Sequence, residues 1–149
     1  VREHLLQLGQ RFNYPPAGMP FDPKEPILLP SMGILSPYRE QVNYLETMFR
    51  EDAVLAPLLT SDTVTINTID GFQGQERDVI YISLVRSNDK HEIGFLQDYR
   101  RMNVAMTRAR MVLVVIGDSA TIGKNKFYQE FLDYCAEQGA YRTAWEFMG

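Results

Sequence analysis

Residues that could form disulfides or bind metals are scarce in this sequence. The 149-residue chain has one cysteine, Cys135, and two histidines, His4 and His91. A single cysteine excludes an intrachain disulfide and gives no reason to expect an oxidising compartment. Structural zinc sites need about four Cys or His ligands. We therefore expect no metal site in this chain.

Long apolar runs are also missing. The longest covers residues 111–116, whereas a membrane-spanning helix needs about 20 apolar residues. No secretory signal stands at the N-terminus. We therefore expect an intracellular, cytoplasmic protein with no membrane partner. Because the chain begins with Val1 instead of Met, we also expect it to be a piece of a longer protein.

The sequence has no excess of positive charge. Fifteen Lys and Arg residues against nineteen Asp and Glu residues give a net charge of −4. Any contact with nucleic acid must therefore come from a local site and not from bulk charge. Hydrophobic residues make up 45% and charged residues 23%, which is typical of globular proteins. The length is that of a single domain with its own core.

The order of expected elements predicts an α/β fold. A short helix over 1–8, ended by Gly9, precedes a Pro-rich connector or insertion over 10–31. Strands are expected over 32–35, 64–68, 79–85 and 111–116, and helices over 37–49, 96–109 and 126–138. Alternating strands and helices imply parallel pairing, and apolar strands imply a sheet covered on both faces. We expect one three-layer domain over 1–149 with a mainly parallel central sheet.

Two of these helices have an apolar face at helical spacing. Ser36 is expected to cap the first of them, with Pro37 at its first position. Its apolar face consists of Tyr38, Val42, Leu45 and Phe49. The apolar face of the last helix consists of Phe127, Phe131, Tyr134 and Cys135.

Three segments could carry chemistry. Ligands in open α/β sheets bind beyond the carboxyl ends of the strands, and we expect all three segments there. Residues 36–39 run from a strand into a helix N-terminus, which suits a phosphate; a plain helix start is the alternative. Residues 68–76 contain Gly71 and Gly74, which allow a tight turn or close approach to a ligand; an ordinary turn is the alternative.

The third segment, residues 100–110, lies in a local basic island. Arg101 and Arg108 are seven residues apart, so they would share one face of a continuous helix. Arginine fits phosphate oxygens with a rigid fork of donors, which favours an anion clamp; a solvated helix face is the alternative. The apolar residues in between would face the sheet: Met102, Val104, Ala105 and Met106.

The Gly-Lys pair at 123–124 does not form a phosphate-binding loop. The pattern G-x-x-x-x-G-K-[ST] requires glycine where the sequence has Asp118, and Ser or Thr where it has Asn125. The chain therefore lacks a Walker A motif. An independent phosphotransferase is not expected.

In this order the three segments resemble motor motifs of superfamily-one helicases. Residues 33–41 are similar to the G-[IV]-[IL]-[ST]-P-Y-x-x-Q segment of the subgroup that contains the RNA helicase of nonsense-mediated decay and the flap-processing nuclease-helicases. Residues 68–76 resemble motif V, and residues 94–110 resemble motif VI with its lead-in. Asp70 and Gln73 stand where repair-type helicases carry His and Lys, which favours the first subgroup.

The resemblance implies a RecA-like, P-loop NTPase-type fold and, of the two lobes between which ATP binds, the second. The Walker A lysine, the metal-binding acidic motif and motif III belong to the N-terminal lobe and are not in this chain. The resemblance therefore implies that ATP and Mg²⁺ are bound mainly by that lobe, which would be a partner of this one. The segment that usually opens the second lobe is also missing.

The same resemblance implies residue roles. Arg108 matches the arginine finger that reaches the γ-phosphate, and is the candidate catalytic residue. The ATP-side residues are Gln73, Gly74, Glu76, Arg101 and Arg108, of which Gln73 and Arg101 would couple the nucleotide state to the grip on nucleic acid. The residues facing single-stranded DNA or RNA are Ser36 and Thr68, with Tyr38 and Arg39 as weaker candidates.

We interpret the chain as the second motor lobe of an ATP-dependent helicase, inactive by itself. The alternative is a non-catalytic nucleic-acid or protein-binding module with a degenerate RecA-like fold. The presence of Gln73, Gly74, Glu76 and Arg108 favours the first interpretation. DNA and RNA are not distinguished, and a 5′→3′ polarity follows from the resemblance alone.

Overall fold

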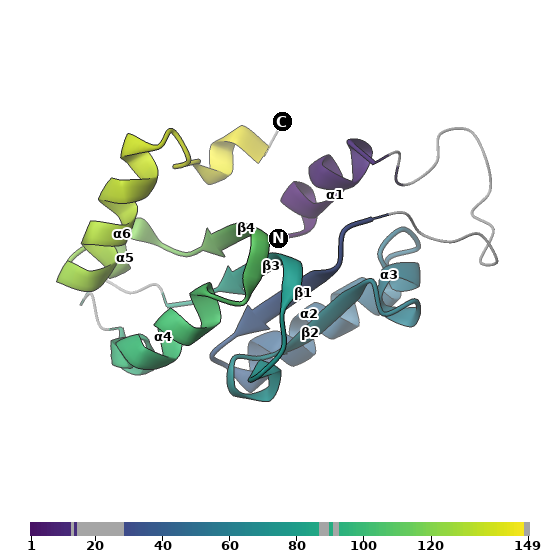
Figure 1. Ribbon diagram of the computed structural model, residues 1–149, viewed down its shortest axis with the longest axis horizontal. Coiled ribbons are helices and arrows are strands. Elements are labelled where there is room, and N and C mark those ends of the chain that lie inside the picture. Colours follow the sequence, from purple (N-terminus) through teal and green to yellow (C-terminus); the bar gives the residue numbers. More distant parts are fainter. Residues whose placement is uncertain (13, 15–28, 87–89, 91–92, 148–149) are drawn as a thin grey trace.

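The structure, a computed structural model, describes residues 1–12, 14, 29–86, 90 and 93–147 (Figure 1). Its one sheet has the strand order β2-β1-β3-β4 and every neighbouring pair is parallel, which confirms the predicted topology. Most of the connector over 10–31 lies outside the described residues. The strands are β1 (Met32–Ser36), β2 (Val64–Thr68), β3 (Arg77–Ser83) and β4 (Ala109–Ile116).

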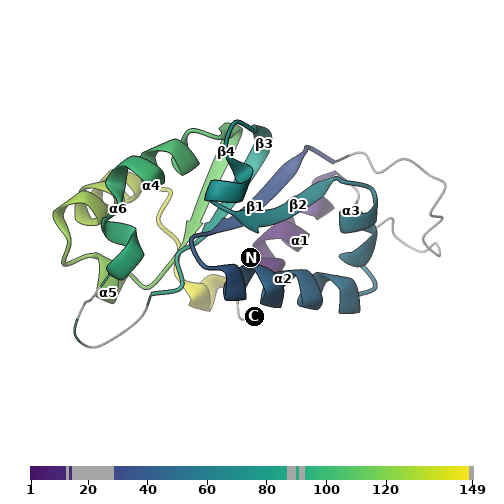
Figure 2. The same cartoon turned by 90° about the horizontal axis from the view of Figure 1, so that it is seen from below.

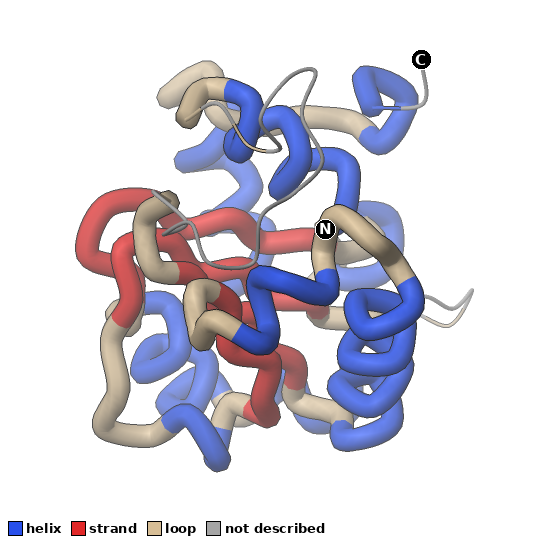
Figure 3. Tube along the Cα trace, turned by 90° about the vertical axis from the view of Figure 1, so that its right-hand side faces the viewer, coloured by secondary structure: helices blue, strands red, loops and turns tan. Residues whose placement is uncertain are grey.

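Helices cover both faces of the sheet (Figures 2 and 3). One face carries α1 (Arg2–Gln10), α2 (Arg39–Glu51) and α3 (Ala56–Thr60). The other carries α4 (Tyr99–Met106), α5 (Ser119–Ile122) and α6 (Lys126–Glu137). Three 3₁₀ turns complete the described structure: η1 (Asp70–Phe72), η2 (Gly94–Gln97) and η3 (Ala144–Phe147). This is the three-layer RecA-like α/β arrangement expected from the sequence.

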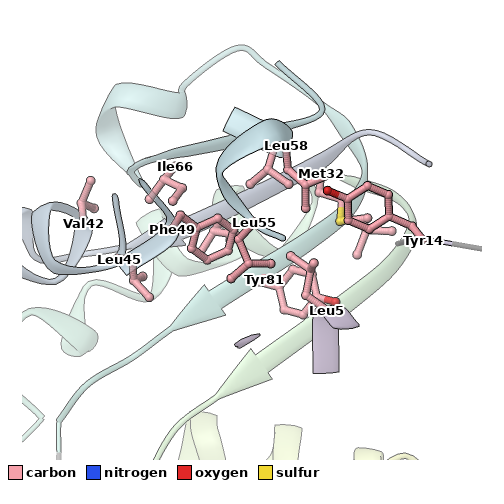
Figure 4. Close-up of a cluster of buried hydrophobic side chains, with 13 residues drawn as sticks. Leu5, Tyr14, Met32, Val42, Leu45, Phe49, Leu55, Leu58, Ile66 and Tyr81 are labelled. Carbon is pink, nitrogen blue, oxygen red and sulfur yellow. The ribbon is translucent and has the colours of Figure 1, made fainter. Parts of the chain in front are cut away.

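The core under α1, α2 and α3 follows the predicted helical spacing. Val42, Leu45 and Phe49 of α2 are buried, which confirms that face of the helix. They pack in one cluster with Leu5 of α1 and Tyr81 of β3 (Figure 4). Full burial of each such side chain stabilises the fold by about 1.5–3 kcal/mol. Helices α1 and α2 are therefore fixed to the sheet by apolar contact.

Two helix boundaries expected in the amino-terminal half of the chain are wrong. Gly9 lies inside α1 and does not end it, because the helix continues to Gln10 and the turn closes with the Arg11 N–H donating to the Leu8 carbonyl. Ser36 is not the N-cap of α2. Tyr38 has extended backbone angles (φ −113°, ψ 123°) and occupies that place, so the helix begins at Arg39.

The expected apolar face of α6 is wrong in part. Tyr134 is 62% exposed, whereas Tyr128 is fully buried and its hydroxyl donates to the Leu96 carbonyl at 2.6 Å. The Tyr128 ring also contacts Tyr99 and Phe127. The first turns of α6 therefore pack on η2 and α4 through Tyr128 and Phe127.

Strand β4 is less covered than the sequence predicts. Met111 is 74% exposed and Val112 is 41% exposed. The strand lies at the edge of the sheet, and the described part of the chain supplies no strand beyond it.

In the same described residues, no helix has the length and apolarity that a membrane crossing requires.

The connection from β2 to β3 crosses the sheet without an α-helix and contains only the short 3₁₀ turn η1. Met32 of β1 pairs with both Val64 and Val79, so β3 begins at the end of the sheet opposite to the one where β2 finishes. Residues 69–76 must therefore pass along β1. Phe72 is buried in this crossing, and a Cβ on Gly33 would lie 3.2 Å from its ring. The same Cβ would lie 2.8 Å from the Ile80 side chain, so glycine at position 33 leaves room for both Phe72 of the loop and Ile80 of β3.

Burial of His4 beside Tyr81 makes the stability of the fold depend on pH. His4 Nδ1 lies 2.9 Å from the Tyr81 hydroxyl oxygen, and burial lowers the pKa of His4. The unfolded chain, with its ordinary His pKa of about 6.5, then binds a proton at a higher pH than the folded chain. The free energy of unfolding should therefore fall as the pH drops below about 6.5.

We expect His4→Gln to remove this part of the acid sensitivity, because glutamine can still pair with the hydroxyl but does not titrate. Urea denaturation of both proteins at several pH values between about 7 and 5 measures it. Equal slopes of unfolding free energy against pH in the two proteins would contradict the assignment.

Candidate nucleotide and nucleic-acid surfaces

Two predicted strand-side residues lie next to each other at the carboxyl edge of the sheet. Ser36 and Thr68 are the last residues of β1 and β2 and are register partners. The Ile69 N–H donates to the Ser36 carbonyl at 3.1 Å. Residues 36–39 and the start of residues 68–76 therefore converge, as expected from the sequence. We call Ser36, Tyr38, Arg39 and Thr68 the strand-side group.

Members of the strand-side group differ in what they present to solvent. The Ser36 side chain is fully buried, and its Oγ accepts the Tyr38 N–H at 3.3 Å. Thr68 Oγ1 accepts the Gly71 N–H at 3.0 Å, and within the described residues its own hydroxyl proton has no acceptor. Arg39 is exposed. Thr68 and Arg39 can thus reach a ligand directly, whereas Ser36 fixes the backbone behind them.

A second surface forms at the opposite end of the sheet. The Arg77 N–H donates to the Arg108 carbonyl at 3.1 Å, which brings Glu76, just before β3, next to Arg108, just before β4. The expectation that all three segments lie at the carboxyl ends is therefore wrong. The crossing loop carries motif V to the amino ends, and α4 runs back along the sheet to the same place (Figure 1).

Helix α4 is shorter than the sequence predicts. It ends at Met106 and Arg108 lies beyond it, so Arg101 and Arg108 do not share a helix face. The apolar run that follows enters β4 and pairs with β3 from position 109 on, which stops the helix. Met102 and Ala105 face the core, but Val104 is 38% exposed and does not.

Arg108 has no carboxylate partner among the described residues. Its Nε donates to the Val104 carbonyl at 3.1 Å and one terminal nitrogen donates to Thr107 Oγ1 at 3.2 Å. The carbonyls at the end of a helix favour a positive charge, so this place holds the guanidinium without neutralising it. Arg110 differs, since its Nε lies 3.0 Å from Asp78 Oδ1.

The motif V residues beside Arg108 are open to solvent. Gln73, Gly74 and Glu76 are all exposed. Gly74 has a φ of +77°, and a Cβ built there would have no atom within 4 Å. Glycine is needed for that backbone conformation, while the space next to it is free for a ligand. We call Gln73, Gly74, Glu76 and Arg108 the ATP-side group.

Arg101 does not join the ATP-side group. It lies near the start of α4, where its Nε is 3.0 Å from Asp70 Oδ1 and 3.8 Å from Asp98 Oδ2. Its guanidinium also lies over the Phe95 ring. Sequence reasoning missed Asp70 and Phe95 as neighbours of Arg101, although both stand inside the motif segments; their proximity follows only from how the loop and α4 pack.

The described residues contain no ready-made metal centre. No group of three or more His, Cys, Asp or Glu side chains that could hold an ion occurs among them. A shallow hollow on α2 is lined by five residues outside both groups: Tyr44, Thr47, Met48, Glu51 and Asp52.

Comparison with known proteins identifies a family and several relatives that are named as helicases. The family described as "AAA domain" matches residues 19–120, about two thirds of the chain. The chain is 39% identical over 144 residues to the DNA polymerase alpha-associated DNA helicase A of Saccharomyces cerevisiae, with 95% of this chain and 18% of that protein covered.

Two further relatives cover less of the chain. Identity to helicase sen1 of Schizosaccharomyces pombe is 43% over 102 residues, with 68% of this chain and 6% of that protein covered. Identity to the DNA-binding protein SMUBP-2 of Mesocricetus auratus is 38% over 117 residues, with 78% of this chain and 11% of that protein covered. The chain spans less than a fifth of the length of these relatives. It belongs to the AAA-domain family and, within it, to the superfamily-one helicases of the nonsense-mediated-decay group.

Proposed function

We propose that this chain is the second motor lobe of an intracellular ATP-dependent DNA or RNA helicase. It works against an N-terminal RecA-like lobe and supplies Arg108 as the arginine finger. One observation carries the proposal: Arg108 stands beside Glu76 at one edge of the sheet with its charge unpaired by any described carboxylate. An arginine held in this way can accept an anion from outside the chain.

Phosphoryl transfer depends mainly on positioning and charge stabilisation, so an arginine brought across a cleft can decide the rate. When the lobes close, the Arg108 guanidinium would leave the Val104 carbonyl and turn to the γ-phosphate oxygens. The Glu76 carboxylate would accept hydrogen bonds from the nucleotide sugar, with room at Gly74 for close approach. Mg²⁺ would neutralise phosphate charge, and we assign its ligands to the N-terminal lobe.

The strand-side group would hold the backbone of a single strand. Thr68 can donate a hydrogen bond to a phosphate oxygen and Arg39 adds a positive charge at the start of α2. Contacts of this kind fix the position of a strand without reading its sequence. That property suits a motor that moves along any sequence.

A direct test replaces Arg108 in a protein that carries both lobes. Arg108→Ala should lower strand-stimulated kcat by about 10³–10⁵, the usual worth of an arginine finger, or about 4–7 kcal/mol. Arg108→Lys should restore little, because an ammonium lacks the planar fork. Steady-state hydrolysis at saturating ATP and oligonucleotide, alongside a melting curve, measures both.

Arg110→Ala is the matched control for this test. It removes the same charge two residues away, but from an exposed ion pair with Asp78, which is worth only about 0–1 kcal/mol. Its hydrolysis should stay near wild type. An Arg108→Ala protein that keeps more than about a tenth of wild-type kcat would refute the finger and favour a degenerate binding module.

The chain by itself should hydrolyse no ATP, because it holds only one side of the nucleotide site. Its affinity for ATP should also be weak. Purified chain, assayed over a range of concentrations with and without oligonucleotide, tests this. Turnover that rises in proportion to chain concentration and survives further purification would show a complete site in this chain.

The strand-side group predicts a salt-dependent loss of binding. Arg39→Ala together with Thr68→Val should weaken the binding of unrelated oligonucleotides by about equal factors, and should reduce the slope of log K against log salt by about one. Arg50→Ala is the control, because it removes the same charge at the other end of α2. Fluorescence anisotropy measures the oligonucleotide affinity of the wild type, the double variant and the control. A loss confined to one oligonucleotide would indicate base readout instead.

A further inference from the structure

Two separate segments connect the strand-side edge to the ATP-side edge. The loop 69–76 begins next to Thr68 and ends at Glu76. Helix α4 begins on the same edge and leads directly to Arg108. At the ATP-side edge the two segments are joined by the hydrogen bond from Arg77 N–H to the Arg108 carbonyl.

A continuous row of side chains joins the same two segments at the strand-side edge. The Arg101 guanidinium pairs with Asp70 in the loop at 3.0 Å and lies 5.5 Å from the centre of the Phe95 ring. Phe95 meets the Tyr38 ring edge to face, with 6.1 Å between ring centres. The row therefore runs from the strand-side group, through Phe95, to α4 and the crossing loop.

The far end of this row is fixed as well. The Tyr38 hydroxyl accepts a hydrogen bond from Arg86 Nε at 3.0 Å, and the same guanidinium lies over the Tyr38 ring. Tyr38 directly precedes the exposed Arg39 and is itself half-buried. A shift of Tyr38 on strand binding would be passed to Phe95 by direct ring contact.

Stability of the fold does not explain these contacts. Phe95 is 58% exposed, and the Asp70 side chain is 65% exposed. Exposed ion pairs contribute little to folding. Phe95 nevertheless contacts both Arg101 and Tyr38. These contacts are better explained by a role in holding the two side chains in position.

We propose that Phe95 and Asp70 are positioning residues that couple occupancy of the strand-side group to the placement of Arg108. They act through Arg101 on α4 and touch neither ATP nor its γ-phosphate. The proposal rests on the proposed function of Arg108, and it adds the physical route by which a bound strand stimulates hydrolysis.

The test compares Phe95→Ala, Asp70→Asn and the double variant in a protein that carries both lobes. Each single variant should reduce the stimulation of kcat by saturating oligonucleotide by at least about fivefold, the lower range of coupling between sites. Hydrolysis without oligonucleotide and the Kd for oligonucleotide should both stay within about twofold of wild type. The double variant should lose little more than either single one, because both act through Arg101.

Matched controls are available on the same chain. Tyr44→Ala removes a ring that is 65% exposed on α2, and Glu130→Gln breaks the exposed pair with Lys126; neither should change stimulation. Unchanged stimulation in Phe95→Ala and Asp70→Asn would overturn the proposal. A weakened Kd with full stimulation at saturation would overturn it too, and would make Phe95 a stacking platform for bases.

Hydrogen exchange separates failure of this proposal from failure of the proposed function. Adding oligonucleotide should slow exchange in α4 of the wild type but not of Phe95→Ala. No response of α4 in the wild type would overturn the coupling even if Arg108→Ala abolishes hydrolysis. Normal hydrolysis by Arg108→Ala, with α4 still responding, would instead refute the finger and leave the coupling of α4 to the strand supported.

Discussion

The path of residues 69–76 across β1 is the constraint on which both candidate surfaces depend. Parallel strands are usually joined by a helix of a dozen or more residues, but here a short loop lies directly on the sheet. The side chain missing from Gly33 leaves room for Ile80 of β3 and for Phe72 of the loop. Motif V therefore begins at the strand-side edge and ends beside Arg108. A bound strand and a bound nucleotide would therefore contact the two ends of one short segment.

Charge pairing distinguishes Arg108 from three arginines that each face a carboxylate. Arg110 is paired with Asp78, Arg101 with Asp70, and Arg2 with Asp52. Among the described residues Arg108 bonds only to a carbonyl and a hydroxyl of its own turn. Those local bonds keep the guanidinium in place while its charge remains available. Under the proposed function, this lobe would thus hold Arg108 ready without a carboxylate partner among its described residues.

Sequence patterns predicted the features that depend on local periodicity. The parallel sheet and the buried face of α2 at Val42 and Phe49 followed from spacing alone, and the meeting of Ser36 with Thr68 followed from the rule on strand ends. The sequence pattern missed the end of α4. Residues 101–108 have a helical pattern, but the helix stops at Met106 because the chain pairs with β3 from position 109 on. The location of Arg108 was missed because it depends on strand register. The contact of Asp70 with Arg101 was missed as well, because it depends on the path of the loop set by the strand register and on the position of α4.

The most direct test of the central claim is a structure of a protein with both lobes, bound to single-stranded nucleic acid, ADP and a planar analogue of the transferred phosphate. The account predicts that the Arg108 guanidinium has left the Val104 carbonyl and lies about 2.7–3.2 Å from the analogue's oxygens, with Glu76 at the nucleotide sugar. Closed lobes with Arg108 still bonded to Val104 and Thr107, and another arginine on the analogue, would contradict it.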